Sequence, residues 1–267
     1  MSNDDQLKVR QTVSKKKSFK ELTIVRDIIF WIDLVGEGQN ENAIFARPFN
    51  EKEAFPQKLT SKKYNIKNNF HGYGGKSYKC IYLKNNFYLI WIDQITNAVW
   101  FQIFKEEESN YRIQKRYLDS VQEPRQLSKS IDGNFDSSFV ISQKNFLYGI
   151  CEINNRDYLF SLNLKKTKQD IYRIKKFKNF AGELSSNTSV SLLSWVEWDY
   201  PYMPWEKNDL CFAQIDLDGE ITKIKKFSDK LINAKKNVSF FQPYWISETL
   251  LVCSEDSSGW WNLLFLD

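Results

Sequence analysis

Few residues of this chain carry the side chains that catalysis or metal binding requires. The sequence of 267 residues holds one histidine, His71, and its four cysteines lie far apart, without a Cys-x-x-Cys pair. A Ser-His-Asp triad needs a histidine against its nucleophile, and a zinc site needs three or four ligands. We therefore expect His71 to be a structural or loop residue. We expect no catalytic residue, metal site or cofactor in this chain.

The cysteines and the N-terminus both indicate a reducing compartment. Cys80, Cys151, Cys211 and Cys253 lie in apolar, strand-like runs, where buried free thiols are more common than disulfides. Residues 1–20 lack the apolar core of a signal peptide. No apolar run reaches the roughly 18 residues of a membrane helix. We expect a cytoplasmic protein that makes no contact with membranes.

Two patterns that could bind nucleotides or nucleic acids are incomplete. Gly75-Lys76-Ser77 resembles the end of a phosphate-binding loop, but that loop needs a glycine where Phe70 stands, and a strand-like segment follows. The formal net charge of +5 comes from lysines spread along the chain. An acid follows each of Trp31, Trp91 and Trp195 two residues later. Proteins that stack nucleic-acid bases on aromatic side chains pair them with a basic groove, so these acids do not suit that role. We expect these tryptophans in the core and no nucleic-acid partner.

A repeat of about 55 residues organises the chain. In each unit an apolar run ends in an acid, and a second run that contains phenylalanine follows it. The runs that end in an acid are Ile29–Asp33, Leu89–Asp93, Gly149–Glu152, Leu193–Glu197 and Val252–Glu255. The phenylalanines of the second runs are Phe45, Phe101, Phe160, Phe212 and Phe265.

Two further runs complete most units. The opening runs are Lys20–Val25, Ser77–Leu83, Ser137–Ser142, a poorly defined stretch near Glu183–Ser189, and Phe240–Ile246. The closing runs are rich in lysine or arginine, as half-exposed edge strands often are; they are Pro56–Thr60, Tyr111–Tyr117, Ile171–Phe177 and Glu220–Phe227. Four strands per unit at this period are typical of β-propeller blades.

The predicted fold is all-β: an incomplete β-propeller with four four-stranded blades and part of a fifth. The full blades are expected at roughly 20–60, 77–127, 135–178 and 180–227, and the partial blade from about 237. Its strands are expected at Phe240–Ile246, Leu250–Ser254 and Trp260–Leu266, and a fourth strand is due where the sequence stops at Asp267. Residues 1–18 are expected to be a flexible N-terminal segment, and residues 19–267 a single partial propeller domain.

Three segments combine aromatic residues, glycine and proline in unusual ways. Phe70–Tyr78 reads F-H-G-Y-G-G-K-S-Y, Trp195–Glu206 reads W-V-E-W-D-Y-P-Y-M-P-W-E, and Phe241–Leu263 contains F-Q-P-Y-W and G-W-W-N-L. They resemble V-H-E-Y-G-G-G-x-Y, W-x-x-W-D-H-P-x-M-P-W-D and F-Q-P-x-W with G-W-W-N-L in prolyl oligopeptidase family serine peptidases. The matching part there is the N-terminal propeller of the dipeptidyl and acylaminoacyl peptidase-like branch. The resemblance covers the chain from about Phe19 to its end.

The resemblance implies a function in a peptidase whose catalytic domain is not part of this sequence. In that family an α/β-hydrolase domain follows the propeller and carries the serine of a G-x-S-x-G elbow. No two glycines of this chain are four residues apart, so that elbow is missing from it. We expect a propeller that restricts access to the active site of the complete peptidase and helps to position short peptides. The expected partners are a separate or missing hydrolase domain and, in the complete enzyme, peptides.

The same motifs supply the candidate site residues. His71, Tyr73, Trp198, Asp199 and Trp205 are expected to gate the substrate or to face the hydrolase domain. The loop that contains the last three could instead simply pack on the propeller face.

The sequence departs from the family pattern at two of the motif positions. Gly72 stands where the family has glutamate, which removes a carboxylate, and Tyr200 stands where it has histidine. Two other interpretations of the whole chain stay open. It could be a non-enzymatic propeller that acts as an interaction scaffold, or a truncated gene product whose last strand exposes an unpaired edge.

Overall fold

The computed structural model describes residues 19–35, 41–108, 116–216, 219–227 and 237–267, and the predicted segment 1–18 lies outside them. The described residues form an all-β structure with one short 3₁₀ helix, η1, at Phe70–Gly72. This confirms the predicted fold class. No helix among them is long and apolar enough to cross a bilayer.

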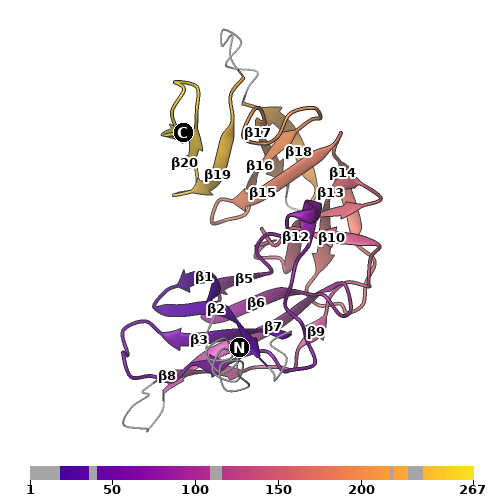
Figure 1. Cartoon of the computed structure of the whole chain (residues 1–267). Coiled ribbons are helices and arrows are strands. Elements are labelled where there is room, and N and C mark those ends of the chain that lie inside the picture. The colour runs from indigo at the N-terminus through magenta and orange to yellow at the C-terminus, as the bar shows by residue number, and fades with distance from the viewer. Residues whose placement is uncertain (1–18, 36–40, 109–115, 217–218, 228–236) are drawn as a thin grey trace, which may run out of the picture.

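The described strands form five antiparallel sheets in chain order (Figure 1), which we number 1 to 5. Sheet 1 contains β1 Lys20–Val25, β2 Ile28–Val35, β3 Glu41–Pro48 and β4 Gln57–Lys58. Sheet 2 contains β5 Tyr78–Leu83, β6 Asn86–Asp93, β7 Ala98–Glu108, β8 Arg116–Ser120 and β9 Arg125–Gln126. Sheet 3 contains β10 Gly133–Phe135, β11 Val140–Ile141, β12 Phe146–Ile153, β13 Arg156–Asn163 and β14 Tyr172–Lys176. Sheet 4 contains β15 Phe180–Ser186, β16 Leu192–Trp198, β17 Asp209–Ile215 and β18 Ile221–Lys226, and sheet 5 contains β19 Phe240–Trp245, β20 Leu251–Glu255 and β21 Asn262–Leu266.

Two-residue turns connect some of the neighbouring strands. Lys84 and Asn85 have φ of 50° and 60°, and Asn154 and Asn155 have φ of 52° and 56°. Two-residue hairpin loops of type I′ need positive φ at both central positions, and asparagine tolerates it better than most side chains. These pairs therefore favour the β5–β6 and β12–β13 hairpins.

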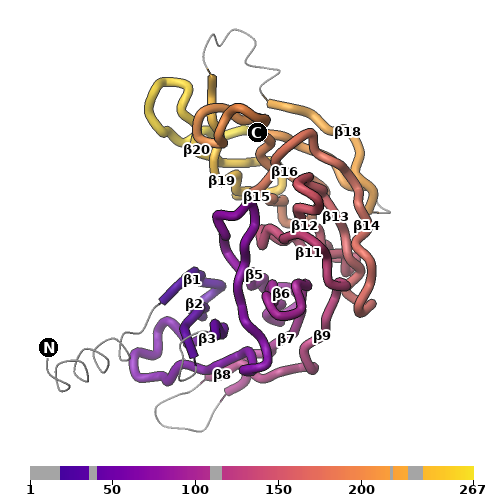
Figure 2. The backbone as a smooth tube through the Cα atoms, turned by 45° about the vertical axis from the view of Figure 1, so that its right-hand side comes forward, coloured from indigo at the N-terminus to yellow at the C-terminus, as the bar shows by residue number. Residues whose placement is uncertain are grey.

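Successive side chains of a strand point to opposite faces of its sheet. The inner strands β6 and β12 are buried at nearly every position, so their sheets pack on both neighbours. Figure 2 shows the sheets as an open arc with β1, β5, β15 and β19 on its concave side. A buried cluster lies between each pair of consecutive sheets. Trp91 faces sheet 1 and Trp195 faces sheet 3, and both are fully buried, which confirms their prediction as core residues.

The opening strands differ most from the prediction. The run expected at Ser137–Ser142 is two short strands, β10 and β11, separated by residues 136–139. The poorly defined run near Glu183–Ser189 belongs to β15, which begins at Phe180. Irregular backbone explains both differences, because an interrupted strand loses the alternating pattern that marks it in sequence. Of the closing run expected at Tyr111–Tyr117, only the last two residues are described, and they begin β8.

Three opening strands contain a bulge at the same place. β1, β15 and β19 each break register there, at Glu21, Glu183 and Gln242, whose φ values are 52°, 59° and 54°. The acids link one sheet to the next. Ser77 N donates to Glu21 Oε2 at 2.5 Å, Glu183 N to Asp136 Oδ2 at 3.2 Å, and Gln242 N to Glu183 Oε2 at 2.6 Å. We call Glu21, Asp136 and Glu183 the inner-strand acceptors.

Candidate functional site

His71 lies on the link 59–77 between sheets 1 and 2, which rises toward β12 and β15 (Figure 2). Asn68 shapes the link: its Nδ2 donates to Lys76 O at 3.0 Å, and its Oδ1 accepts from Phe70 N at 2.9 Å. η1 then presents the His71 ring to sheet 3, where Nε2 lies 2.8 Å from Asp157 Oδ2. The link therefore contacts a sheet that is not its neighbour in sequence.

Asp157 ties three parts of the chain together. The same oxygen that contacts His71 accepts a hydrogen bond from Ala181 N of β15 at 2.7 Å. Burial raises the pKa of Asp157, and the hydrogen bond from His71 partly opposes that rise. A buried carboxyl group needs such partners, so this residue fixes the link against sheets 3 and 4.

Aromatic rings surround His71. Its centroid lies 3.8 Å from that of Phe70, 5.3 Å from that of Phe180 and 5.5 Å from that of Trp198. Phe180 and Trp198 also stack on each other at 5.6 Å. The structure therefore brings together His71 and Trp198, two of the residues predicted from separate motifs.

The loop 199–208 connects β16 to β17 and is held by its own hydrogen bonds. Tyr202 N donates to Asp199 O at 3.0 Å, and Met203 N donates to Glu206 Oε2 at 2.8 Å. Asn208 Nδ2 donates to Pro204 O at 2.8 Å, and the Tyr200–Pro201 peptide bond is cis. These contacts give the aromatic loop a defined conformation beside sheet 4.

Asp199 joins this loop to the start of sheet 4. Its carboxylate accepts from Lys178 Nζ and from Asn179 Nδ2, both at 2.8 Å. Burial alone would raise the pKa of Asp199, but these two hydrogen bonds outweigh it and the pKa is lowered. Asp199 is therefore an ionised partner of Lys178 near neutral pH.

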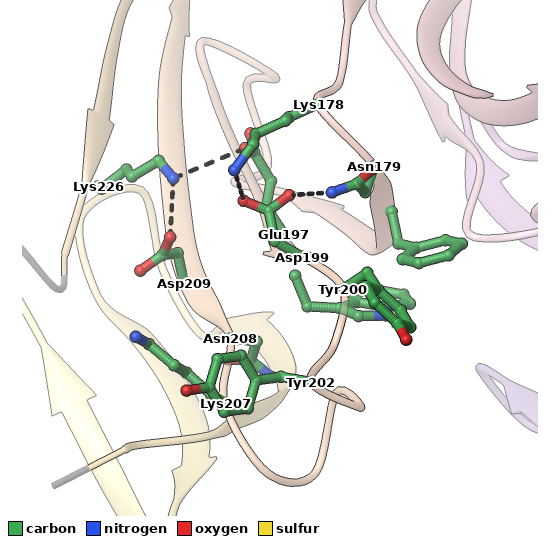
Figure 3. Close-up of a pocket in the computed structure, with 12 residues that line it drawn as sticks. Lys178, Asn179, Glu197, Asp199, Tyr200, Tyr202, Lys207, Asn208, Asp209 and Lys226 are labelled. Carbon is green, nitrogen blue, oxygen red and sulfur yellow. Dashed lines mark hydrogen bonds and ion pairs between the residues drawn. The ribbon is translucent and has the colours of Figure 1, made fainter.

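A pocket of about 330 Å³ opens between this loop and the ends of the sheet 4 strands (Figure 3). Aromatic side chains form part of its wall; they are Phe180, Trp198, Tyr200 and Tyr202. Charged pairs form the rest. Lys178 pairs with Asp199, and Lys226 lies 2.7 Å from Asp209 and 3.9 Å from Glu197. The Lys207 ammonium lies 5.3 Å from the centre of the Tyr202 ring. Such a wall suits a ligand that has both apolar and charged groups, as a peptide does.

The predicted residues divide into two sets. Trp198 and Asp199 line the pocket, and His71 packs behind Trp198. Tyr73 and Trp205 do not line it, and their side chains are 80% and 60% exposed. The sequence did not single out Lys178, Lys207 or Lys226, because an isolated lysine is usually a solvated residue. Tyr202 lies within the motif Trp195–Glu206, but it was not among the predicted site residues.

Glycine at position 72 fits the local backbone. Gly72 has a φ of 73°, and a Cβ added there would meet no atom within 4 Å. The left-handed conformation, rather than crowding, therefore disfavours a glutamate at this site. Gly72 occupies a left-handed turn that glycine adopts without strain, and the carboxylate of the motif is absent there.

The comparisons with known proteins show where this fold occurs. No family model matches the chain, and no curated protein sequence matches it. A puromycin-hydrolyzing peptidase from Mycobacterium tuberculosis has a similar structure, with a TM-score of 0.73 and 16% identity over 94% of this chain. A puromycin hydrolase structure gives a TM-score of 0.73 and 16% identity over 95% of this chain. A mutant of puromycin hydrolase complexed with PGG gives 0.74 and 16%, also over 95%.

These similarities cover nearly all of this chain but a smaller share of the peptidases. The chain spans 37% of the length of the mycobacterial protein and 38% of the length of puromycin hydrolase. At this identity the likeness shows a shared fold. It fits the fold expected from the sequence motifs, an N-terminal propeller of peptidases of this kind.

Proposed function

We propose that this chain is the N-terminal propeller portion of a serine peptidase of the prolyl oligopeptidase family. Sheets 1 to 4 then correspond to four blades, and sheet 5 to part of a fifth. One coincidence carries the proposal. The Trp- and Pro-rich family motif at Trp195–Glu206 supplies part of the pocket wall, in a fold shared with peptidases over 94% of the chain.

In the complete enzyme the propeller would restrict access to an α/β-hydrolase active site and help to position short peptides. The pocket and the exposed Trp205 and Tyr200 side chains supply a surface for that task. His71 and Asp157 would act as positioning residues, because they hold Trp198 in the pocket wall without lining it themselves.

We further propose that the chain has no peptidase activity by itself. Its one histidine is engaged with Asp157, and in the described part of the chain no serine is hydrogen-bonded to the imidazole. A serine nucleophile needs an adjacent base to attack a peptide bond.

The first test is to sequence the DNA downstream of codon 267 in all three frames. We expect one frame to encode further strands and a G-x-S-x-G elbow. The two polypeptides, purified together, should then hydrolyse puromycin or aminoacyl p-nitroanilides, and replacing the elbow serine by alanine should abolish this.

Two results would contradict the peptidase assignment. One is the absence of such a frame together with no activity alongside any co-purifying protein. The other is hydrolysis by the chain alone that survives purification and responds to His71→Phe. If no such frame and no activity are found, the interaction-scaffold interpretation would replace the peptidase assignment.

A further inference from the structure

The ion pairs in the wall of the pocket leave one cation available. Lys178 pairs with Asp199 at 2.8 Å, and Lys226 pairs with Asp209 at 2.7 Å. Lys207 is the third lysine of the wall, and it forms no ion pair with any residue that the structure describes. Figure 3 shows it apart from both pairs. The pocket therefore offers a ligand one unpaired positive charge.

The three carboxylates of the wall, by contrast, already have donors. Glu197 Oε1 accepts hydrogen bonds from Trp195 Nε1 at 2.8 Å and from Lys175 Nζ at 2.9 Å. Asp199 and Asp209 each have a lysine partner. An ammonium group of a ligand would have to compete with these donors, whereas an anionic group would not. The wall therefore favours a ligand whose charged group is negative.

Hydrogen bonds fix the backbone around Lys207. Its N–H donates to Met203 O at 3.2 Å. The next residue, Asn208, is 4% exposed, and its side chain donates to Phe240 O and accepts from Phe240 N, both at 2.8 Å. These bonds tie the end of the loop to β19. The Lys207 side chain is exposed but begins from a fixed point, so little order is lost when a ligand binds it.

An aromatic surface lies next to the unpaired ammonium group. Lys207 Nζ is 5.3 Å from the centre of the Tyr202 ring, and Tyr202 is 38% exposed. The last residue of a peptide carries its carboxylate and its side chain on the same Cα, so one residue can reach both groups. An internal acidic residue carries its carboxylate at the tip of its side chain and has no apolar group beside it. The spacing therefore favours a chain end.

The size of the pocket also suits a chain end. Its volume of about 330 Å³ is near the lower limit of the roughly 300–1,000 Å³ that small-molecule sites occupy. A shallower hollow of about 720 Å³ shares part of the wall and is also lined by Arg156, Lys175 and Lys176. These cations make the approach to the pocket positive, which attracts anionic ligands.

We propose that this pocket binds the C-terminal carboxylate of short peptides through Lys207, with the last side chain of the peptide against Tyr202. The inference rests on the proposed function in one respect, that the pocket takes peptides, and it adds which end of the peptide is held. The amino end of the peptide has no partner in this pocket, because the wall carboxylates are already paired.

Isothermal titration calorimetry of this chain with the peptide Ala-Ala-Phe tests the proposal. Three forms of the peptide separate its ends: the free acid, the C-terminal amide and the N-acetylated acid. The two acids should bind equally. The amide should bind about tenfold more weakly, which is the loss expected for one charge-assisted hydrogen bond at an exposed site. Raising the salt concentration should weaken binding of the acids more than that of the amide.

Variants of Lys207 assign the preference to one side chain. Lys207→Met removes the charge and should bind acid and amide with equal affinity, whereas Lys207→Arg should keep the preference. Lys165→Met is the matched control, because Lys165 is an exposed lysine that lines neither hollow. It should bind like the unmodified chain. Tyr202→Ala should weaken both forms of the peptide by a similar factor, roughly threefold.

Several results would overturn the proposal. Equal binding of acid and amide, or no binding of either, would show that the pocket holds no carboxylate. Loss of binding on N-acetylation would show that it holds the amino end instead. A preference that survives in Lys207→Met, or disappears in Lys165→Met, would assign it to the general positive charge. None of these measurements involves the hydrolase domain. A downstream frame with an active elbow serine could therefore support the peptidase assignment even where this proposal fails.

Discussion

Single side chains hold the candidate site in place. His71 is buried among three aromatic rings and contacts the buried carboxyl group of Asp157. Leaving a buried acceptor without its donor costs about 1 to 3 kcal/mol. His71 therefore matters more for the position of Trp198 than for any reaction.

Replacing His71 by phenylalanine keeps an aromatic ring but removes the donor to Asp157. We expect the free energy of unfolding in urea to fall by about 1 to 3 kcal/mol. Asp157→Asn should lose a similar amount, and the double variant should lose clearly less than the sum of both. Additive losses would show that the two residues do not interact.

Glu183 makes stability depend on pH. Burial raises its pKa from 4.5 to about 7, and Asp136 adds to the rise, while the hydrogen bond from Gln242 N opposes it. The folded state then holds more protons than the unfolded state between those values. Stability is therefore highest below about pH 4.5 for this group, and falls as pH rises toward 7.

Glu183→Gln keeps an acceptor for Gln242 N and removes the titrating group. Urea unfolding at pH 5 and pH 8 should show a loss of about 1 to 3 kcal/mol in the unmodified chain that is smaller or absent in the variant. The variant should be the more stable of the two at pH 8. Parallel profiles for both proteins would assign the pH dependence to other groups.

At the scale of elements, the opening strands decide how the sheets meet. Gly133 in β10 lies so close to β12 that an added Cβ would stand 1.8 Å from Glu152 O. Backbone atoms cannot yield as a flexible side chain can. Gly182 in β15 differs, because its added Cβ would find the Trp198 ring at 3.7 Å, an ordinary contact.

Gly133→Ala should consequently separate β10 from β12 and destabilise the chain by about 2 kcal/mol or more. Gly182→Ala is the matched control and should change stability by less than about 1 kcal/mol. Thermal unfolding of both variants measures the difference. Equal effects would mean that the close approach of β10 to β12 has no energetic weight.

The sequence predicted the elements better than the site. Continuous apolar runs that end in an acid located β2, β6 and β16, because such a run bounded by turn residues is typical of a buried strand. The bulges at Glu21 and Glu183 interrupt their strands. The opening run of the fourth unit was expected only as a poorly defined stretch near Glu183–Ser189, and β15 spans Phe180–Ser186. His71 contacts sheets 3 and 4, and its partner Asp157 lies 86 residues further along the chain. No local pattern encodes such a contact.

At the scale of the whole molecule, stability should vary along the arc. Sheet 3 is covered on both faces by apolar clusters, whereas the described contacts of sheet 5 cover one. In repeat architectures each unit is stabilised mainly by its neighbours. Backbone amides of β12 and β13 should therefore exchange with deuterium most slowly, and those of β21 fastest among the strands of the described sheets.

Native-state hydrogen exchange read by mass spectrometry measures this order. Peptides from 146–163 should stay protected longest, and peptides from 262–266 should exchange first. Uniform protection along the chain would point to a single cooperative unit.

The inner-strand acceptors all point one way along the chain. Glu21, Asp136 and Glu183 each lie on an earlier sheet and accept a hydrogen bond from a backbone N–H of a later sheet. During synthesis on the ribosome, sheets 2, 4 and 5 would therefore find an acceptor already present on the sheet before them. Docking of these three sheets can follow translation, whereas the link 59–77 reaches its final position only after Asp157 and Ala181 have been made.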